Sequence, residues 1–138
     1  MSQPLSAQVT DEQLVVLYGE DPAAAARART RIDRLVELFE KTFAPVVPTS
    51  VYTSAGRTEL GGNHTDHQRG KGLAASVDWD VLAVASRTDG DMVHVASMKH
   101  GENMVKVGDW EKDPAETGKS NALLRGVCRA FVDRGYPI

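Results

Sequence analysis

The stretch Leu73–Arg87, L-A-A-S-V-D-W-D-V-L-A-V-A-S-R, determines the expected fold. Its apolar side chains alternate with their neighbours, which predicts one long β-strand. The alternating residues are Val77, Trp79, Val81, Ala83 and Ala85. An Asp-Gly pair at 89–90 is a turn signal, and it is followed by apolar stretches at Met92–Met98 and Asn103–Val107. We therefore expect residues 73–107 to form an antiparallel meander.

Two helices are expected before these strands. Thr10 and Gln13 have the spacing of a capping box, which predicts a helix over residues 10–18. An Asp-Pro pair at 21–22 starts a second helix, which should end near Phe43. One face of the second helix carries apolar residues at helical spacing: Ile32, Leu35, Val36, Phe39 and Phe43.

A short strand over 51–54 and a last helix complete the expected elements. The last helix should start at Thr117 or Ser120 and end near Arg134, with Gly135 closing it. Its apolar stripe consists of Leu123, Leu124, Val127, Cys128 and Phe131. The order of elements predicts one α+β domain over residues 1–138, with helices packed on a mostly antiparallel sheet.

Composition excludes several functional classes. The chain has 138 residues and a formal net charge of -3, so it lacks the basic footprint of a nucleic-acid-binding protein. The N-terminal residues have neither a basic start nor an apolar run, and no stretch reaches the roughly 18 apolar residues of a membrane helix. The single cysteine, Cys128, cannot form an internal disulfide and is expected to be buried. We expect a cytoplasmic protein with no nucleic-acid or membrane partner.

The most unusual part of the sequence is the stretch 57–70, R-T-E-L-G-G-N-H-T-D-H-Q-R-G. It combines charged, imidazole and amide side chains with glycines that let the backbone turn and approach a ligand closely. Sugar hydroxyls both donate and accept hydrogen bonds, so a dense mixture of short polar groups suits them. The stretch therefore predicts a site for a small polar molecule.

Two other chemistries have partial motifs. His64, Asp66 and His67 resemble part of a metallohydrolase pattern, but Gly62 occupies the position of its first histidine, and three neighbouring residues cannot close a metal site alone. We predict no metal here and expect His94 and His100 to be surface or cross-strand residues. The T-G-K-S sequence at 117–120 has the end of a phosphate loop, but position 113 is aspartate instead of glycine. We expect it to be a helix N-terminus capped by serine.

The twelve residues from Gly56 to His67, G-R-T-E-L-G-G-N-H-T-D-H, resemble the galactokinase signature G-R-x-N-L-I-G-E-H-T-D-Y. Galactokinases belong to a superfamily with homoserine, mevalonate and phosphomevalonate kinases. Residues 70–78, G-K-G-L-A-A-S-V-D, are similar to the family's continuation into its first long strand. Three positions differ from the usual pattern: Ala55 replaces proline, Asn63 replaces glutamate and His67 replaces tyrosine.

The resemblance implies a fold, a reaction and a set of site residues. The fold would be the N-terminal part of a ribosomal protein S5 domain 2-like kinase fold. The reaction would transfer a phosphoryl group from ATP, with magnesium, to the C1 hydroxyl of galactose. Arg57 would stabilise the transition state, and the galactose-binding residues would be Asn63, His64, Thr65 and Asp66.

The resemblance also implies that the main ATP and magnesium ligands, and the catalytic base, lie beyond Ile138. The chain is then expected to be an N-terminal fragment that is inactive alone and exposes apolar surface. Two alternatives remain open. One is a non-catalytic galactose-binding or regulatory homologue, and the other is a kinase for N-acetylgalactosamine.

Overall fold

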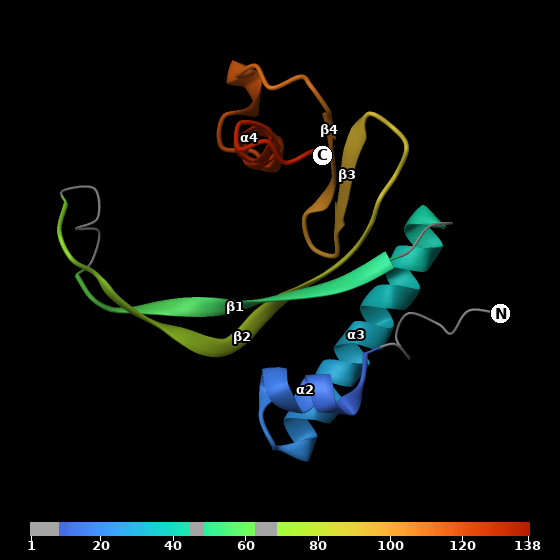
Figure 1. Ribbon diagram of the computed structural model, residues 1–138, viewed down its shortest axis with the longest axis vertical. Coiled ribbons are helices and arrows are strands. Elements are labelled where there is room, and N and C mark those ends of the chain that lie inside the picture. The colour runs from blue at the N-terminus through green and yellow to red at the C-terminus, as the bar shows by residue number, and fades with distance from the viewer. Residues whose placement is uncertain (1–8, 45–48, 63–68) are drawn as a thin grey trace. The chain divides into compact units, whose positions relative to one another are not determined.

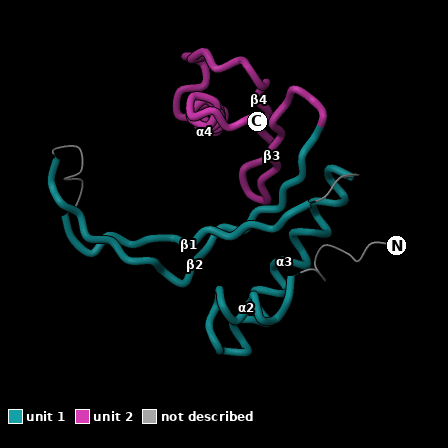
Figure 2. The backbone as a smooth tube through the Cα atoms, in the orientation of Figure 1, with its two compact units in different colours: residues 1–88 teal, residues 89–138 magenta. Residues whose placement is uncertain are grey.

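A computed structural model describes residues 9–44, 49–62 and 69–138 of the chain. The chain divides into two compact units, residues 1–88 and residues 89–138 (Figure 2). Each unit combines helical and antiparallel β-structure, which confirms the α+β class. No helix in the described part of the chain is both long and apolar enough to cross a lipid bilayer.

The first unit begins with two helices whose ends follow local sequence signals. Helix α2 (Asp11–Tyr18) has the predicted capping box: Thr10 Oγ1 accepts from the Gln13 N–H at 3.2 Å, and Gln13 Oε1 accepts from the Thr10 N–H at 2.9 Å. Gly19 ends this helix with a φ of 82°, in the region that favours glycine. Helix α3 (Pro22–Phe43) starts after its cap Asp21, as predicted.

Strands β1 (Thr49–Gly61) and β2 (Leu73–Ser86) then form one long antiparallel hairpin (Figure 1). The predicted strand over 73–87 is confirmed. The prediction that β1 covers only 51–54 is wrong, because the strand continues through Arg57 to Gly61. Its backbone groups pair with β2 along this length, so even a polar, glycine-containing segment becomes a strand.

One face of the hairpin packs on the helices. The buried core of this unit consists of Leu14 in α2 and three residues of α3: Ala28, Ile32 and Val36. Val51 of β1 and both Leu82 and Val84 of β2 pack against this core. Alternate residues point to the opposite face, where Trp79 is 83% exposed and Val81 is 71% exposed.

The second unit contains a short hairpin, one turn of 3₁₀-helix and the last helix. Strands β3 (Met92–Ser97) and β4 (Gly101–Lys106) pair antiparallel, close to the predicted ranges. The 3₁₀-turn η2 (Pro114–Glu116) precedes helix α4 (Ser120–Val132), which packs against β4. Val105 and Cys128 are the buried apolar residues of this unit, so the expectation of a buried thiol is confirmed.

Two predictions are wrong, one about strand pairing and one about the cap of α4. Within the described residues, β2 pairs with β1 and β3 pairs with β4, giving two two-stranded sheets and no meander through β2, β3 and β4. The Asp-Gly pair at 89–90 stands where the two units join. Ser120 does not cap α4 either: it is the first helical residue, and the cap position holds Lys119, whose side chain makes no capping hydrogen bond.

Candidate functional site

Arg57 lies in the middle of the hairpin, on β1 and opposite Ser76 of β2. Its side chain is exposed. The pairing register shifts between Ala55 and Arg57, and Gly56 occupies the shift. A Cβ atom on Gly56 would lie 2.9 Å from the Trp79 carbonyl oxygen, so only glycine fits this close approach of the two strands.

The other predicted site residues, Asn63, His64, Thr65 and Asp66, lie outside the described residues. In the sequence they follow Gly62, the residue after β1, and they precede Arg69 and β2. Gly62 has a φ of 85°, and a Cβ atom there would overlap the Lys71 carbonyl oxygen. Arg57 therefore stands on the same hairpin that contains the sugar-binding candidates, and their side-chain geometry stays a prediction.

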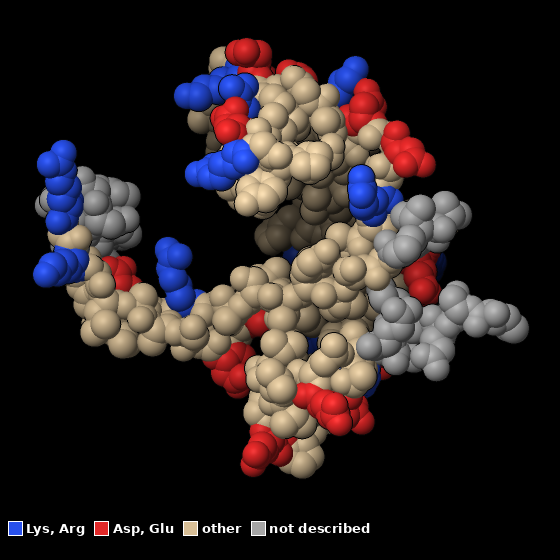
Figure 3. Space-filling view, in the orientation of Figure 1, with Lys and Arg blue, Asp and Glu red and all other residues tan. Residues whose placement is uncertain are grey.

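Basic side chains are frequent on this part of the hairpin (Figure 3). Arg57, Arg69 and Lys71 are all exposed. A guanidinium group presents several N–H donors in a planar fork, which matches the oxygen atoms of phosphate or carboxylate. Glu59 on the same strand is also exposed and acidic, so the described residues of this part of the hairpin carry a small excess of positive charge.

A second polar cluster surrounds Asp80 on β2. The Asp80 side chain is only 7% exposed. Tyr18 Oη donates to Asp80 Oδ2 at 2.6 Å, and Thr53 Oγ1 donates to the same oxygen at 2.8 Å. Arg31 Nη1 lies 2.6 Å from Asp80 Oδ1, in an ion pair and not an aligned hydrogen bond. This one carboxylate thus joins α2, α3 and β1 to β2.

The environment of Asp80 shifts two pKa values. Burial of the Asp80 carboxyl would raise its pKa, but the hydrogen bonds from Tyr18 and Thr53, together with the adjacent guanidinium of Arg31, hold the pKa below its usual range. The pKa of Tyr18 is raised, first by burial of the phenol and then by its hydrogen bond to Asp80. Asp80 is therefore ionised and Tyr18 is a protonated donor at neutral pH.

This cluster was not predicted from the sequence, although the strand pattern contained a signal. Asp80 has the same parity along β2 as Leu82 and Val84, which pack on the helical core. An acidic residue on the core-facing side of a strand needs a buried partner. Its partners come from three other elements, and their spacing in the sequence does not identify them.

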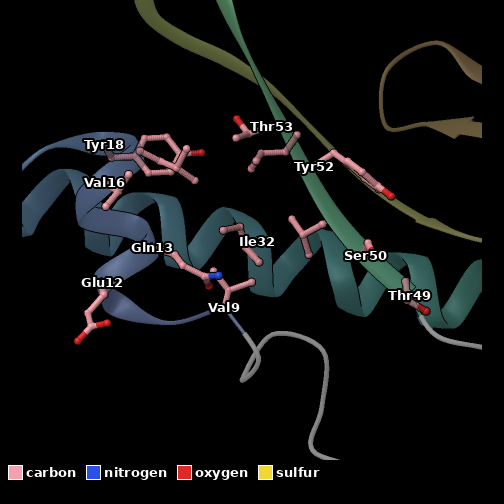
Figure 4. A pocket seen from close by; sticks show the side chains of 13 residues that line it. Val9, Glu12, Gln13, Val16, Tyr18, Ile32, Thr49, Ser50, Tyr52 and Thr53 are labelled. Atoms are coloured by element: carbon pink, nitrogen blue, oxygen red, sulfur yellow. The ribbon is translucent and has the colours of Figure 1, made fainter.

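An open groove of about 670 Å³ lies between α2 and the hairpin (Figure 4). Tyr18 and Thr53 are among its polar lining residues, and much of the lining is aliphatic: Val9, Val16, Leu17, Ile32, Val51 and Leu82. Several of these residues also pack on the core of the first unit. We assign no ligand to this groove.

The alternative chemistries gain no support from the described residues. His94 Nε2 lies 2.9 Å from Glu102 Oε2 on the neighbouring strand, which confirms a cross-strand role, and His100 is exposed. No group of three or more metal-ligating side chains occurs among the residues that the structure describes. His64, Asp66 and His67 lie outside them, so the metal hypothesis for that motif is not tested. The T-G-K-S sequence follows η2, whereas a phosphate loop follows a strand.

Comparison with known proteins finds a family model that matches the part of the chain containing the hairpin. The family model of the galactokinase galactose-binding signature matches residues 37–87, from the second half of α3 to the residue after β2. The chain therefore carries the galactose-binding signature of the galactokinase family, which confirms the resemblance. No solved structure matches the chain.

Proposed function

We propose that this chain provides the sugar-binding part of a galactokinase. The observation that carries the proposal is the signature match over 37–87, which contains every predicted site residue. In this proposal Asn63, His64, Thr65 and Asp66 bind galactose hydroxyls. Their amide, imidazole, hydroxyl and carboxylate groups supply the mixture of donors and acceptors that a sugar requires.

Arg57 is the proposed transition-state stabiliser. Phosphoryl transfer depends mainly on positioning and on stabilisation of charge at the transferred group. Its guanidinium is exposed, lies on the strand that leads to the predicted sugar-binding residues, and is accessible to a ligand. The basic character of this region supports the assignment, because it favours the negative charge of ATP and of a sugar phosphate.

ATP and magnesium enter the proposal through the family alone. The described residues contain no group of three or more metal ligands, and the T-G-K-S sequence has neither the spacing nor the preceding strand of a phosphate loop. The described residues therefore do not fit a Mg-ATP site, and we derive no catalytic step from them. When bound, Mg-ATP would supply the transferred phosphoryl group. The ribosomal protein S5 domain 2-like fold and a cytoplasmic location are further parts of the proposal.

A second candidate function is galactose binding without catalysis. It is favoured by Asn63, which places a neutral amide where galactokinases usually have glutamate. An amide both donates and accepts hydrogen bonds but carries no charge, so it can bind a hydroxyl more weakly and with another preference. The same substitution motivates the comparison of galactose with N-acetylgalactosamine.

Calorimetric titration of the chain with galactose, N-acetylgalactosamine and glucose tests sugar binding. We expect saturable binding of galactose, loss of binding in Asp66→Ala and no change in His100→Ala, which alters an exposed residue of the second unit. The absence of saturable binding to galactose and to N-acetylgalactosamine would refute the proposal. Galactose-dependent ADP release then separates the candidates, and because the ATP ligands are expected beyond Ile138 it is measured in a coupled assay with the full-length protein. Release supports the kinase, and galactose binding without release by the full-length protein supports the non-catalytic function.

A further inference from the structure

The far half of the hairpin has little packing of its own. Residues 57–61 of β1 are exposed, as are Leu73, Ala74 and Ser76 on β2. Figure 1 shows the hairpin extending beyond α2 and α3. The hairpin residues that pack on the core, Val51, Leu82 and Val84, all lie nearer its base. The orientation of the far half must therefore be set where the hairpin leaves the helices.

Asp80 stands at that point. In the strand register it is opposite Ala55, the last paired residue of β1 before the shift. Its carboxylate accepts hydrogen bonds from Tyr18 of α2 and Thr53 of β1 and pairs with Arg31 of α3. Nearly buried hydrogen bonds to a charged group are both strong and directional, so they fix an angle that apolar packing alone leaves free.

The register shift makes this angle important. Irregularities of this kind bend a strand and increase its twist, so a small rotation at Ala55 moves everything beyond it. Gly56 brings the strands into close approach at the Trp79 carbonyl, directly beside Asp80. Arg57 follows immediately on β1, and the predicted galactose-binding residues come six to nine positions after Arg57 in the sequence.

We propose that Asp80 is a positioning residue, which fixes the far half of the hairpin relative to α2 and α3 and thereby places Arg57 and the sugar-binding residues. This inference rests on the proposed function for its consequence, but not for the anchoring itself. Asp80 touches neither substrate nor cofactor in this role. It acts through the orientation of the strand pair.

The anchoring is tested by double electron–electron resonance between spin labels on Glu37→Cys in α3 and Thr58→Cys in β1, in a Cys128→Ala background. Both labelled positions are exposed. Asp80→Asn keeps the shape of the side chain but removes its charge, and we expect the distance distribution to widen about twofold as the local restraint is lost. Ile32→Val, which removes one methyl group from the same core, is the control and should leave the width unchanged.

The functional consequence is tested by galactose titration of the same variants. We expect Asp80→Asn to raise the Kd about tenfold, because misplacement of binding groups by even about 1 Å weakens a site strongly. Ile32→Val should stay within about twofold, even though it also lowers thermal stability. Tyr18→Phe, which removes one donor to Asp80, serves as the second variant if Asp80→Asn does not fold.

The outcomes separate the proposed role of Asp80 from the proposed sugar-binding function. An unchanged distance distribution in Asp80→Asn and Tyr18→Phe overturns the inference whether or not galactose binds. A widened distribution with an unchanged Kd also overturns it, because the anchor would then have no effect on the site. If the unmodified chain binds no galactose, the proposed function is wrong, and the distance distribution still decides whether Asp80 fixes the hairpin.

Discussion

Replacement of Tyr18 by phenylalanine measures how strongly the Asp80 cluster holds the first unit together. The substitution removes one hydroxyl group, whose oxygen lies 2.6 Å from Asp80 Oδ2. This distance is typical of a hydroxyl donating to an ionised carboxylate. Such hydrogen bonds contribute roughly 1.5–3 kcal/mol, and Asp80 keeps Thr53 and Arg31 as partners in the variant. We therefore expect a loss of about 1.5 kcal/mol in the free energy of unfolding at pH 7, or roughly 6–12 °C in Tm for a unit of this size.

The pH dependence of this loss follows from the two pKa shifts. The pKa of Asp80 is lower in the folded chain than in the unfolded chain, so its stabilising effect is fully present above the ordinary aspartate pKa. That effect is lost as the pH falls through the folded pKa. The pKa of Tyr18 is raised, so the phenol stays a donor through neutral and mildly alkaline pH. The difference in the free energy of unfolding between Tyr18→Phe and the unmodified chain should thus be constant from about pH 5 to pH 9 and shrink in strong acid.

Urea unfolding, followed by far-ultraviolet circular dichroism, provides the measurement. The control is Tyr52→Phe, which removes a hydroxyl from a 58% exposed side chain on the same hairpin and should change stability by less than about 0.5 kcal/mol. Combination with Asp80→Asn gives a double-mutant cycle, in which the two losses should overlap by about 1 kcal/mol. Strictly additive losses, or equal losses in the two tyrosine variants, would refute the assignment of the hydrogen bond as a stabilising contact.

Three further predictions test the strand contact, the core and the site. Gly56→Ala should destabilise the chain by about 1–3 kcal/mol in thermal melts, because its Cβ would lie 2.9 Å from a backbone oxygen. Its control is Gly126→Ala, in an open position of α4, which should stabilise the chain by about 0.5–1 kcal/mol. Ile32→Ala should cost about 2–5 kcal/mol in urea unfolding, and a loss below 1 kcal/mol would mean that this residue, 3% exposed, is not core. Arg57→Ala should lower galactose-dependent ATP consumption by the full-length protein roughly 100-fold, and Arg129→Ala, whose guanidinium pairs with Asp133 in the second unit, should leave this rate unchanged.

The helices could be predicted from the sequence because their signals are local. Thr10 and Gln13 are three residues apart, and each satisfies a backbone N–H of the other. Asp21 similarly accepts a hydrogen bond from the N–H of Ala23. At α4 the local signal was misleading: Ser120 is a good capping residue, but the backbone becomes helical at Ser120 itself, and Lys119 takes the cap position.

Strand pairing could not be predicted in the same way, because it depends on partners distant in the sequence. The turn signal at 89–90 suggested that β2 pairs with the strand after it. The observed partner is β1, which is reached through the polar stretch that looked like a loop. Apart from Thr58, the local composition of 57–61 does not favour a strand, and the ladder with β2 provides the hydrogen bonds that make it one.

The candidate site was predicted only in part, for a physical reason. Arg57, Asn63, His64, Thr65 and Asp66 were found because their residue types form a recognisable sequence. Asp80 was missed because its role comes from contacts with residues 62 and 27 positions away, Tyr18 and Thr53. A sequence motif identifies the groups that touch a ligand more readily than the groups that hold them in place.

The two halves of the hairpin have different roles: the near half packs on the core, and the far half carries the proposed sugar-binding residues. Residues that bind a sugar must be polar, accessible and free of competing partners, and residues of this kind do not form a core. The far half of the hairpin accordingly has glycines and exposed side chains, and the near half has Val51, Leu82 and Val84 on the helices. Asp80 lies at the boundary, where a rigid connection is required if the stable half is to orient the binding half. Substitutions on the core side should therefore lower Tm with little change in sugar affinity. Substitutions beyond Arg57 should lower sugar affinity with little change in Tm, and substitutions at Asp80 should lower both Tm and sugar affinity.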